Sequence, residues 1–186
     1  MNYLGGIIMK ITTKELISCS IFAAFISIFA QISIPLPFTA IPLTLQIFAV
    51  AMTGIILGPR CGFISVLIYL LLGGIGLPVF SNFSGGIAIL VGPTGGYLLG
   101  FPLMTFIIGY FREKFNYSNV IIIGLLFGLL VDYTTGTLMF SAISGNSIYQ
   151  SLVYCVIPFI FTDLLKLALA FIVGSTVYKR VSNYVH

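Results

Sequence analysis

Two long stretches without a charged residue constrain this chain more than any other feature of its sequence. Residues 16–59 and 61–111 contain no Asp, Glu, Lys or Arg. A helix needs about 20 mostly apolar residues to cross a membrane, so each stretch has room for two such helices. Charged residues make up 6% of the 186-residue chain, against roughly a quarter in soluble proteins. The sequence therefore predicts an integral membrane protein.

Breaks rich in proline, glycine and small polar residues divide the chain into six predicted membrane-spanning helices. We place these spans at residues 14–33, 42–58, 61–77, 94–111, 119–142 and 151–178. The segment Gly58–Gly62 (GPRCG) predicts a tight turn between the second and third spans. We expect an all-α membrane protein with one six-helix, substrate-binding domain over residues 14–186, preceded by an extension of residues 1–13. No loop is long enough to hold a soluble domain.

The distribution of basic residues predicts the orientation of the bundle. Seven of the eight lie at the termini, in the second–third loop or in the fourth–fifth loop: Lys10, Lys14, Arg60, Arg112, Lys114, Lys179 and Arg180. By the positive-inside rule, both termini and these loops are cytoplasmic. Because the basic residues are scattered over short segments, the net charge of +4 does not indicate a nucleic-acid site.

Asp163 and Lys166 are the closest pair of opposite charges inside an apolar segment, and Lys166 is the one basic residue that departs from the topology rule. At positions i and i+3 of a helix, the two side chains share a face. Ionisable residues inside the membrane usually mark a functional site. Three interpretations stay open: a polar anchor for a ligand, a salt bridge that only fixes helix packing, and a proton relay.

The loop between the third and fourth spans offers further ligand-binding candidates. Asn82, between Phe80 and Phe83, has an amide with one acceptor and two donors beside two aromatic rings, which suits a small, partly apolar ligand. The alternative is an Asn that only forms a turn. Tyr97, near the start of the fourth span, is either a site residue or part of an interfacial aromatic belt.

Small residues on two spans predict close helix approach. Gly96 and Gly100 are four residues apart on the fourth span. Ala23, Ser27 and Ala30 form a stripe on the first span, which serves either packing within the bundle or docking of another membrane subunit.

Asp132 lies in the fifth span, and its sequence leaves open whether it faces a cavity or bonds locally to neighbouring hydroxyls. Two intramembrane aspartates raise the possibility of an intramembrane hydrolase. The segments around Asp132 and Asp163 lack the motifs of intramembrane aspartyl proteases, and the single histidine is His186 at the C-terminus. We therefore expect no enzymatic activity. The chain also has no phosphate-binding G-x-x-x-x-G-K-[ST] loop, so any ATP would be used by another subunit.

Four segments together resemble the BioY family, the biotin-specific S components of energy-coupling-factor (ECF) transporters. They are Ile32–Gln46 (ISIPLPFTAIPLTLQ), Gly73–Phe80 (GGIGLPVF), Ser84–Phe101 (SGGIAILVGPTGGYLLGF) and Pro158–Lys166 (PFIFTDLLK). The chain departs from the family pattern at Thr162, where a glycine is common, and in having no tryptophan.

The resemblance implies a six-helix subunit of a prokaryotic plasma membrane that binds biotin from outside, in a pocket gated by residues 33–39. It also implies partners: a transmembrane T component and two ABC-type ATPases, with the T component meeting the first span at Ala23, Ser27 and Ala30. Biotin carries two ureido N–H donors, one carbonyl and a carboxylate. On this interpretation Asp163 accepts hydrogen bonds from the ureido N–H groups, and Asn82 or Lys166 donates to the ureido carbonyl. Alternatively, Lys166 binds the carboxylate of biotin. Phe80, Phe83 and Tyr97 would then line the pocket. An S component for a different vitamin is the alternative function.

Overall fold

The computed structural model describes residues 11–37, 39, 41–115 and 117–185, the last five without their side chains. Most of the predicted N-terminal extension, together with Lys10 and His186, lies outside the described residues. The elements in chain order are α1 (Thr13–Gln31), β1 (Ser33–Ile34), β2 (Leu43–Thr44), α2 (Gln46–Gly74), η1 (Ser81–Phe83), α3 (Ile87–Leu90), α4 (Gly95–Phe115), α5 (Ser118–Ser144), α6 (Ile148–Cys155) and α7 (Ile160–Val185).

Local sequence signals explain where several helices begin and end. Thr12 and Glu15 form a reciprocal capping box at the start of α1, and Ser147 and Gln150 do the same for α6. Helix α5 ends at Gly145, which adopts the left-handed conformation with φ 72°. These caps satisfy backbone groups that a helix end would otherwise leave without partners.

The predicted turn between the second and third spans is confirmed as a sharp bend inside α2. Gly58 has φ 75° and ψ −174°, a backbone conformation that favours glycine, and Pro59 follows it. A Cβ atom placed on Gly62 would lie 3.5 Å from the Thr53 carbonyl oxygen, so the two arms of α2 fold back on one another. The second and third predicted spans therefore correspond to the two arms of α2, which are two helices separated by the kink at Gly58.

The last predicted span was placed too early. Residues 151–178 cover the end of α6 and most of α7, with a break at residues 156–159. Pro158 explains the break, because it has no N–H for the helix ladder and disfavours helical geometry in the residue before it. Asp163 therefore lies in the first turn of α7 rather than in the middle of a span.

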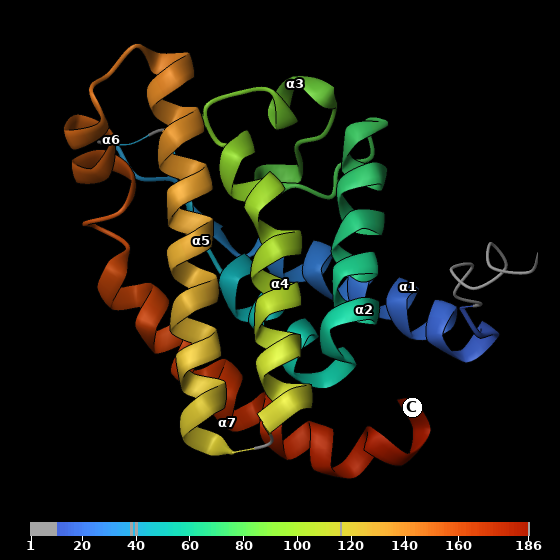
Figure 1. Cartoon of the computed structure of the whole chain (residues 1–186). Coiled ribbons are helices and arrows are strands. Elements are labelled where there is room, and N and C mark those ends of the chain that lie inside the picture. Colours follow the sequence, from blue (N-terminus) through green and yellow to red (C-terminus); the bar gives the residue numbers. More distant parts are fainter. Residues whose placement is uncertain (1–10, 38, 40, 116, 186) are drawn as a thin grey trace, which may run out of the picture.

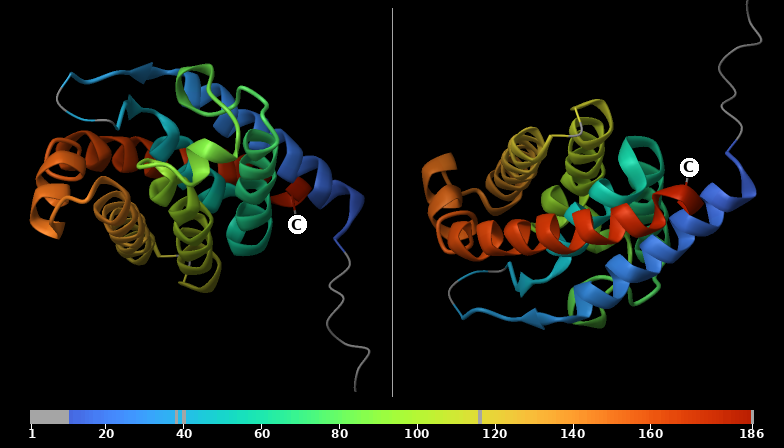
Figure 2. Two further views of the ribbon diagram at one scale, coloured as in Figure 1. Left: turned by 90° about the horizontal axis from the view of Figure 1, so that it is seen from above. Right: turned by 90° about the horizontal axis from the view of Figure 1, so that it is seen from below.

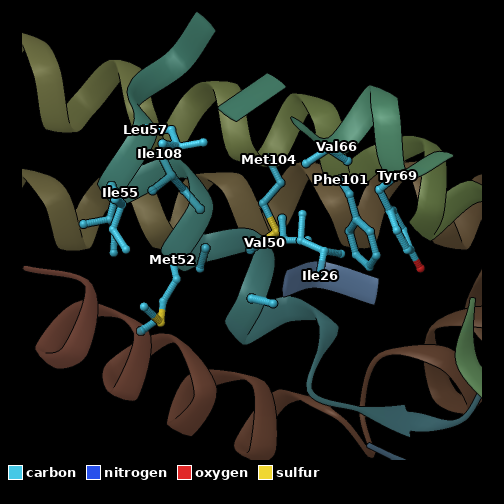
Figure 3. Close-up of a cluster of buried hydrophobic side chains, with 14 of the residues drawn as sticks. Ile26, Val50, Met52, Ile55, Leu57, Val66, Tyr69, Phe101, Met104 and Ile108 are labelled. Carbon is cyan, nitrogen blue, oxygen red and sulfur yellow. The ribbon is translucent and has the colours of Figure 1, made fainter. Parts of the chain in front are cut away.

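Two groups of helices make up the bundle. Helices α4, α5 and the second arm of α2 run roughly alongside one another, while α1 and α7 run across them on one side of the bundle (Figures 1 and 2). Helix α2 contacts α1, α4 and α7, and α4 contacts α5. Buried side chains of α1, α2 and α4, such as Ile26, Tyr69 and Met104, form the core between them (Figure 3).

The predicted small-residue face of α4 does lie against another helix. A Cβ atom on Gly96 would lie 2.6 Å from the Met139 Cβ and 3.0 Å from the Gly136 Cα of α5. Only a glycine at this position allows so close an approach of α4 and α5.

One short β ladder was not predicted. Ser33 pairs with Thr44 and Ile34 with Leu43, which joins the two ends of the α1–α2 loop. Pro35 disfavours helical geometry in Ile34, the residue before it, which favours the extended backbone of β1.

Four described helices are long and apolar enough to cross a membrane: α1, α2, α5 and the Ile160–Arg180 part of α7. The first arm of α2, residues 46–57, would be about 18 Å long, shorter than the roughly 30 Å of bilayer hydrocarbon. The count of six spans therefore stays a prediction, although each predicted span has a helical counterpart.

Candidate functional site

A cavity opens inside the bundle at the end that carries α3, α6 and the β ladder. Its space not filled by protein atoms, including the part open to the outside, is about 630 Å³. The α1–α2 loop, α2, the loop before α3 and helices α4, α5 and α7 all contribute to its walls. A pocket with mostly apolar walls and a few convergent polar groups is the usual form of a small-molecule site.

Asp163 and Lys166 lie on the α7 side of this cavity, and the structure pairs them. The Lys166 Nζ donates a hydrogen bond of 2.7 Å to the Asp163 Oδ1. Both residues are buried, with 2% of Asp163 and 7% of Lys166 exposed. Asp163 also lies in the first turn of α7, where the positive end of the helix dipole stabilises a carboxylate.

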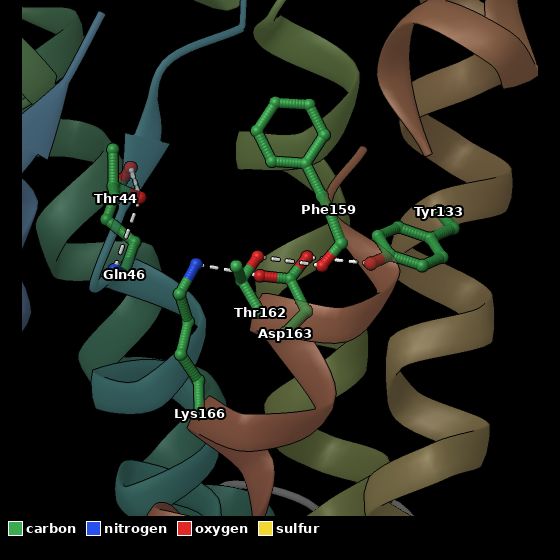
Figure 4. A network of polar contacts seen from close by, with 7 residues as sticks. All are labelled: Thr44, Gln46, Tyr133, Phe159, Thr162, Asp163 and Lys166. Carbon is green, nitrogen blue, oxygen red and sulfur yellow. Dashed lines mark hydrogen bonds and ion pairs between the residues drawn. The ribbon is translucent and has the colours of Figure 1, made fainter. Parts of the chain in front are cut away.

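Tyr133 of α5 completes a three-residue network that the sequence did not predict. Its hydroxyl donates to the Asp163 Oδ2 at 2.7 Å, so each carboxylate oxygen has one donor within the protein (Figure 4). A carboxylate oxygen accepts up to two hydrogen bonds, so each retains capacity for a ligand donor. In the sequence Tyr133 is only one of the hydroxyl residues that neighbour Asp132, whereas in the structure its hydroxyl bonds to Asp163.

A second group of hydrogen-bonded polar residues lies on the α2 side of the cavity. The Gln46 amide nitrogen donates to the Tyr69 hydroxyl at 2.7 Å, and the Thr44 hydroxyl donates to the Gln46 amide oxygen at 3.0 Å. Gln46 is buried, and both Thr44 and Gln46 line the cavity. No sequence pattern pointed to Gln46, because a lone glutamine at a helix start is ordinary.

Aromatic side chains line the rest of the wall. Phe80 is fully buried and packs edge-on against Tyr69, with 5.4 Å between ring centroids. Tyr97 is held by a hydrogen bond of 3.2 Å from its hydroxyl to the Cys155 carbonyl oxygen. Both residues were candidates, and both line the cavity together with Phe101 and Phe159.

Asn82 and Phe83 are not among the residues that line the cavity. Asn82 is exposed, and Phe83 is 72% exposed. Both adopt positive φ values, 56° and 54°, which is uncommon for residues other than glycine. Their neighbour Ser81 does line the cavity, so the loop reaches its rim.

Gln31, the last residue of α1, holds this loop in place. Its amide nitrogen donates to the carbonyl oxygens of Val79 and Phe80 at 3.2 and 3.0 Å, and its amide oxygen accepts from the Phe83 N–H at 2.8 Å. These three bonds link the end of α1 to the segment that positions Phe80.

Asp132, whose direction the sequence left open, faces the same cavity. It has no exposed surface, and neither carboxyl oxygen has a hydrogen-bond partner among the described residues. Asp132 of α5 and the pair Asp163 and Lys166 of α7 therefore line the same cavity.

The small stripe of α1 lies mostly inside the bundle. Ala23 and Ala30 are 1% and 0% exposed, and Ala23 belongs to the core that α1 shares with α2. Ser27 is partly exposed, and its hydroxyl bonds to the Ala23 carbonyl oxygen. In this arrangement the two alanines have no free surface for another subunit, which favours the packing interpretation.

Sequence and structure comparisons agree on one family. A model of the BioY family matches residues 6–183. The chain is 44% identical over 161 residues to a probable biotin transporter BioY of Pyrococcus horikoshii, covering 87% of this chain and 94% of that protein. It is 39% identical over 166 residues to the biotin transporter BioY of Thermotoga maritima, covering 89% and 96% respectively.

A solved structure has the same fold. The crystal structure of the S-component for biotin from an ECF-type ABC transporter superposes with a TM-score of 0.83 at 32% identity, covering 91% of this chain and 95% of that one. The family match over nearly the whole chain and these relatives lead to one conclusion: the chain belongs to the BioY family.

Proposed function

We propose that this chain is the membrane-embedded subunit that captures biotin for uptake by an ECF-type transporter. The observation that supports this most directly is the cavity, in which Asp163, Lys166 and Tyr133 form a buried polar network within a mostly apolar bundle. Burying charges in this way is costly unless they serve a ligand or a partner. Two relatives that the chain matches over nearly their whole length are named biotin transporters, which supports biotin as that ligand.

Biotin suits this cavity chemically. We assign ureido N–H donation to the free acceptor capacity of Asp163, and the ureido carbonyl to a donor such as Lys166. The sulfur ring would lie against Phe80 and Tyr97. In this assignment Asn82 and Phe83 reach the ligand only if the loop that Gln31 holds moves over the cavity mouth.

The ends of the bundle support an orientation with the cavity open to the outside. The loops at the cavity end carry no Lys or Arg, whereas the Gly58 bend with Arg60 and the α4–α5 connection with Arg112 and Lys114 lie at the opposite end (Figure 1). On the positive-inside rule, we therefore propose that the cavity end faces outside and that both termini are cytoplasmic.

We further propose that the chain works with a transmembrane T component and two ABC-type ATPases, as an S component without enzymatic activity of its own. The family and the fold of the solved biotin S-component support this assignment. Because Ala23 and Ala30 are buried, docking at the α1 stripe would need either Ser27 and its exposed neighbours or a rearrangement of the bundle.

Direct binding tests the proposal. The purified protein in lipid nanodiscs should bind labelled biotin saturably, and an excess of unlabelled biotin should displace it. Riboflavin, thiamine and folate serve as competitors of different chemistry and should not displace it. Absence of saturable biotin binding by correctly folded protein, or displacement by one of the other vitamins at equal concentration, would contradict biotin as the ligand.

A further inference from the structure

Asp132 contributes a buried carboxyl to the cavity that takes no part in the network around Asp163. Its side chain lies in the cavity wall with no exposed surface, and both Oδ1 and Oδ2 lack a hydrogen-bond partner among the described residues. Buried polar atoms in folded proteins nearly always have a hydrogen-bond partner, so a carboxyl group whose two oxygens both lack one requires an explanation.

The donors closest in sequence are already occupied. The Tyr133 hydroxyl donates to Asp163, and the Thr135 hydroxyl turns back to the carbonyl oxygens of Val131 and Asp132 at 3.2 and 3.0 Å. Lys166 donates to the Asp163 Oδ1. The described part of the chain thus offers no donor to the Asp132 carboxyl, although it lies among polar residues.

Helix packing does not account for the carboxyl either. Asp132 lies where α5 passes α4 at Gly100, since a Cβ atom on Gly100 would be 2.7 Å from the Asp132 Oδ1. An apolar residue could fill this space without the desolvation cost of a buried unsatisfied polar group, about 1–3 kcal/mol or more for a charged one. A group that lowers stability and points into a ligand cavity is typical of a binding residue.

We propose that Asp132 is a second ligand-binding residue of this cavity, which accepts one ureido N–H of biotin while Asp163 accepts the other. The inference rests on the proposed function, because it takes biotin as the ligand. Biotin has two N–H donors on opposite sides of its ureido carbonyl, and the cavity offers two carboxyl groups from two different helices. One ligand would thereby connect α5 to α7, and a ligand without both N–H groups would leave one carboxyl unsatisfied.

Two variants and a control test this assignment. Asp132→Leu removes the carboxyl, Asp132→Asn keeps its size and one oxygen, and Thr134→Ala changes an exposed residue two positions along the same helix. We expect Asp132→Leu to weaken biotin binding about tenfold or more, which is roughly the cost of leaving one buried N–H donor of the ligand without an acceptor. Asp132→Asn should lose less, and Thr134→Ala should bind like the wild type.

The melting temperature of the ligand-free protein separates binding from structure. Asp132→Leu should melt at the same temperature as the wild type or higher, because it removes an unsatisfied buried group. Unchanged biotin affinity in both Asp132 variants, or a lower melting temperature that accompanies weaker binding in both, would overturn the inference.

Biotin derivatives methylated at one or the other ureido nitrogen identify the contact. In the wild type both derivatives should bind weakly. In Asp132→Leu, methylation of one nitrogen should cost clearly less than in the wild type, whereas equal costs would overturn the pairing. Wild-type protein that fails to bind biotin would refute the proposed function, whereas wild-type binding with unaffected variants would refute only the role of Asp132.

Discussion

Tyr133 and Asp163 join α5 to α7 through a hydrogen bond of 2.7 Å between the tyrosine hydroxyl and the Asp163 Oδ2. The two helices have few other contacts, since α7 packs mainly against α2 and α5 mainly against α4. This bond and the Asp163–Lys166 ion pair therefore hold the Asp163 carboxylate in place in the cavity wall, between α5 and α7. A carboxylate held by two donors has little freedom to turn, so a ligand meets it in one orientation.

Asp163→Asn should weaken biotin binding about tenfold or more. The amide oxygen still accepts, but the amide nitrogen presents donors where the cavity needs an acceptor, and it also faces the Lys166 ammonium. Isothermal titration calorimetry in nanodiscs measures the change. Tyr133→Phe is the matched comparison: it removes one donor and leaves the carboxylate, so its loss should be smaller. Unchanged affinity in Asp163→Asn would move the ureido contact away from α7.

Lys166→Met should lower the stability of the protein more than the same substitution at an exposed lysine would. Removing one partner of a buried ion pair typically costs about 3–5 kcal/mol, because the other charge stays buried without compensation. A double variant with Asp163→Asn should recover part of the thermal stability but none of the affinity. Equal melting temperatures for Lys166→Met and the wild type would show that the pair contributes little to folding.

The sequence predicted the residues whose chemistry conflicts with their surroundings. Asp163 and Lys166 were identifiable because charges are expensive in an apolar segment, and the bend at Gly58 because glycine and proline interrupt helices. Asp132 was identifiable for the same reason, but the sequence did not show which side of the helix its side chain faces. Helix α5 is apolar nearly all round, so no polar face indicates which side meets the cavity.

Loop residues and small residues were harder to place. Asn82 and Phe80 are two positions apart, yet one is exposed and the other is buried in the cavity wall, because the left-handed backbone at Asn82 turns the chain. A stripe such as Ala23 and Ala30 suits contact with a helix of the same chain as well as with another protein. Only the packing of α1 against α2 distinguishes the two.

Gln31→Ala should accelerate the release of biotin more than it slows its capture. The side chain makes three hydrogen bonds to the segment from Val79 to Phe83, and two residues of that segment have positive φ values that the bonds help to maintain. Without these bonds the loop at the cavity mouth should open more readily. Stopped-flow measurement of biotin dissociation tests this, with Ser20→Ala, an exposed residue of the same helix, as the control. Identical dissociation rates in Gln31→Ala and the wild type would show that the loop does not retain the ligand.

Gly96→Ala should lower the melting temperature of the protein. The new methyl group would lie 2.5 Å from the Thr135 carbonyl oxygen and 2.6 Å from the Met139 Cβ, so α4 and α5 must separate. Overpacking of this kind costs about 1–3 kcal/mol, which exceeds the gain of roughly 0.5–1 kcal/mol expected when alanine replaces glycine in a helix.

Gly74→Ala is the matched control for this change. Its methyl group would meet only the end of the Leu90 side chain, at 3.3 Å, and that flexible end has room to shift. Thermal melts in the same detergent should show a lower transition for Gly96→Ala and an unchanged or higher one for Gly74→Ala. If both variants have the same melting temperature, Gly96 does not determine the spacing of α4 and α5.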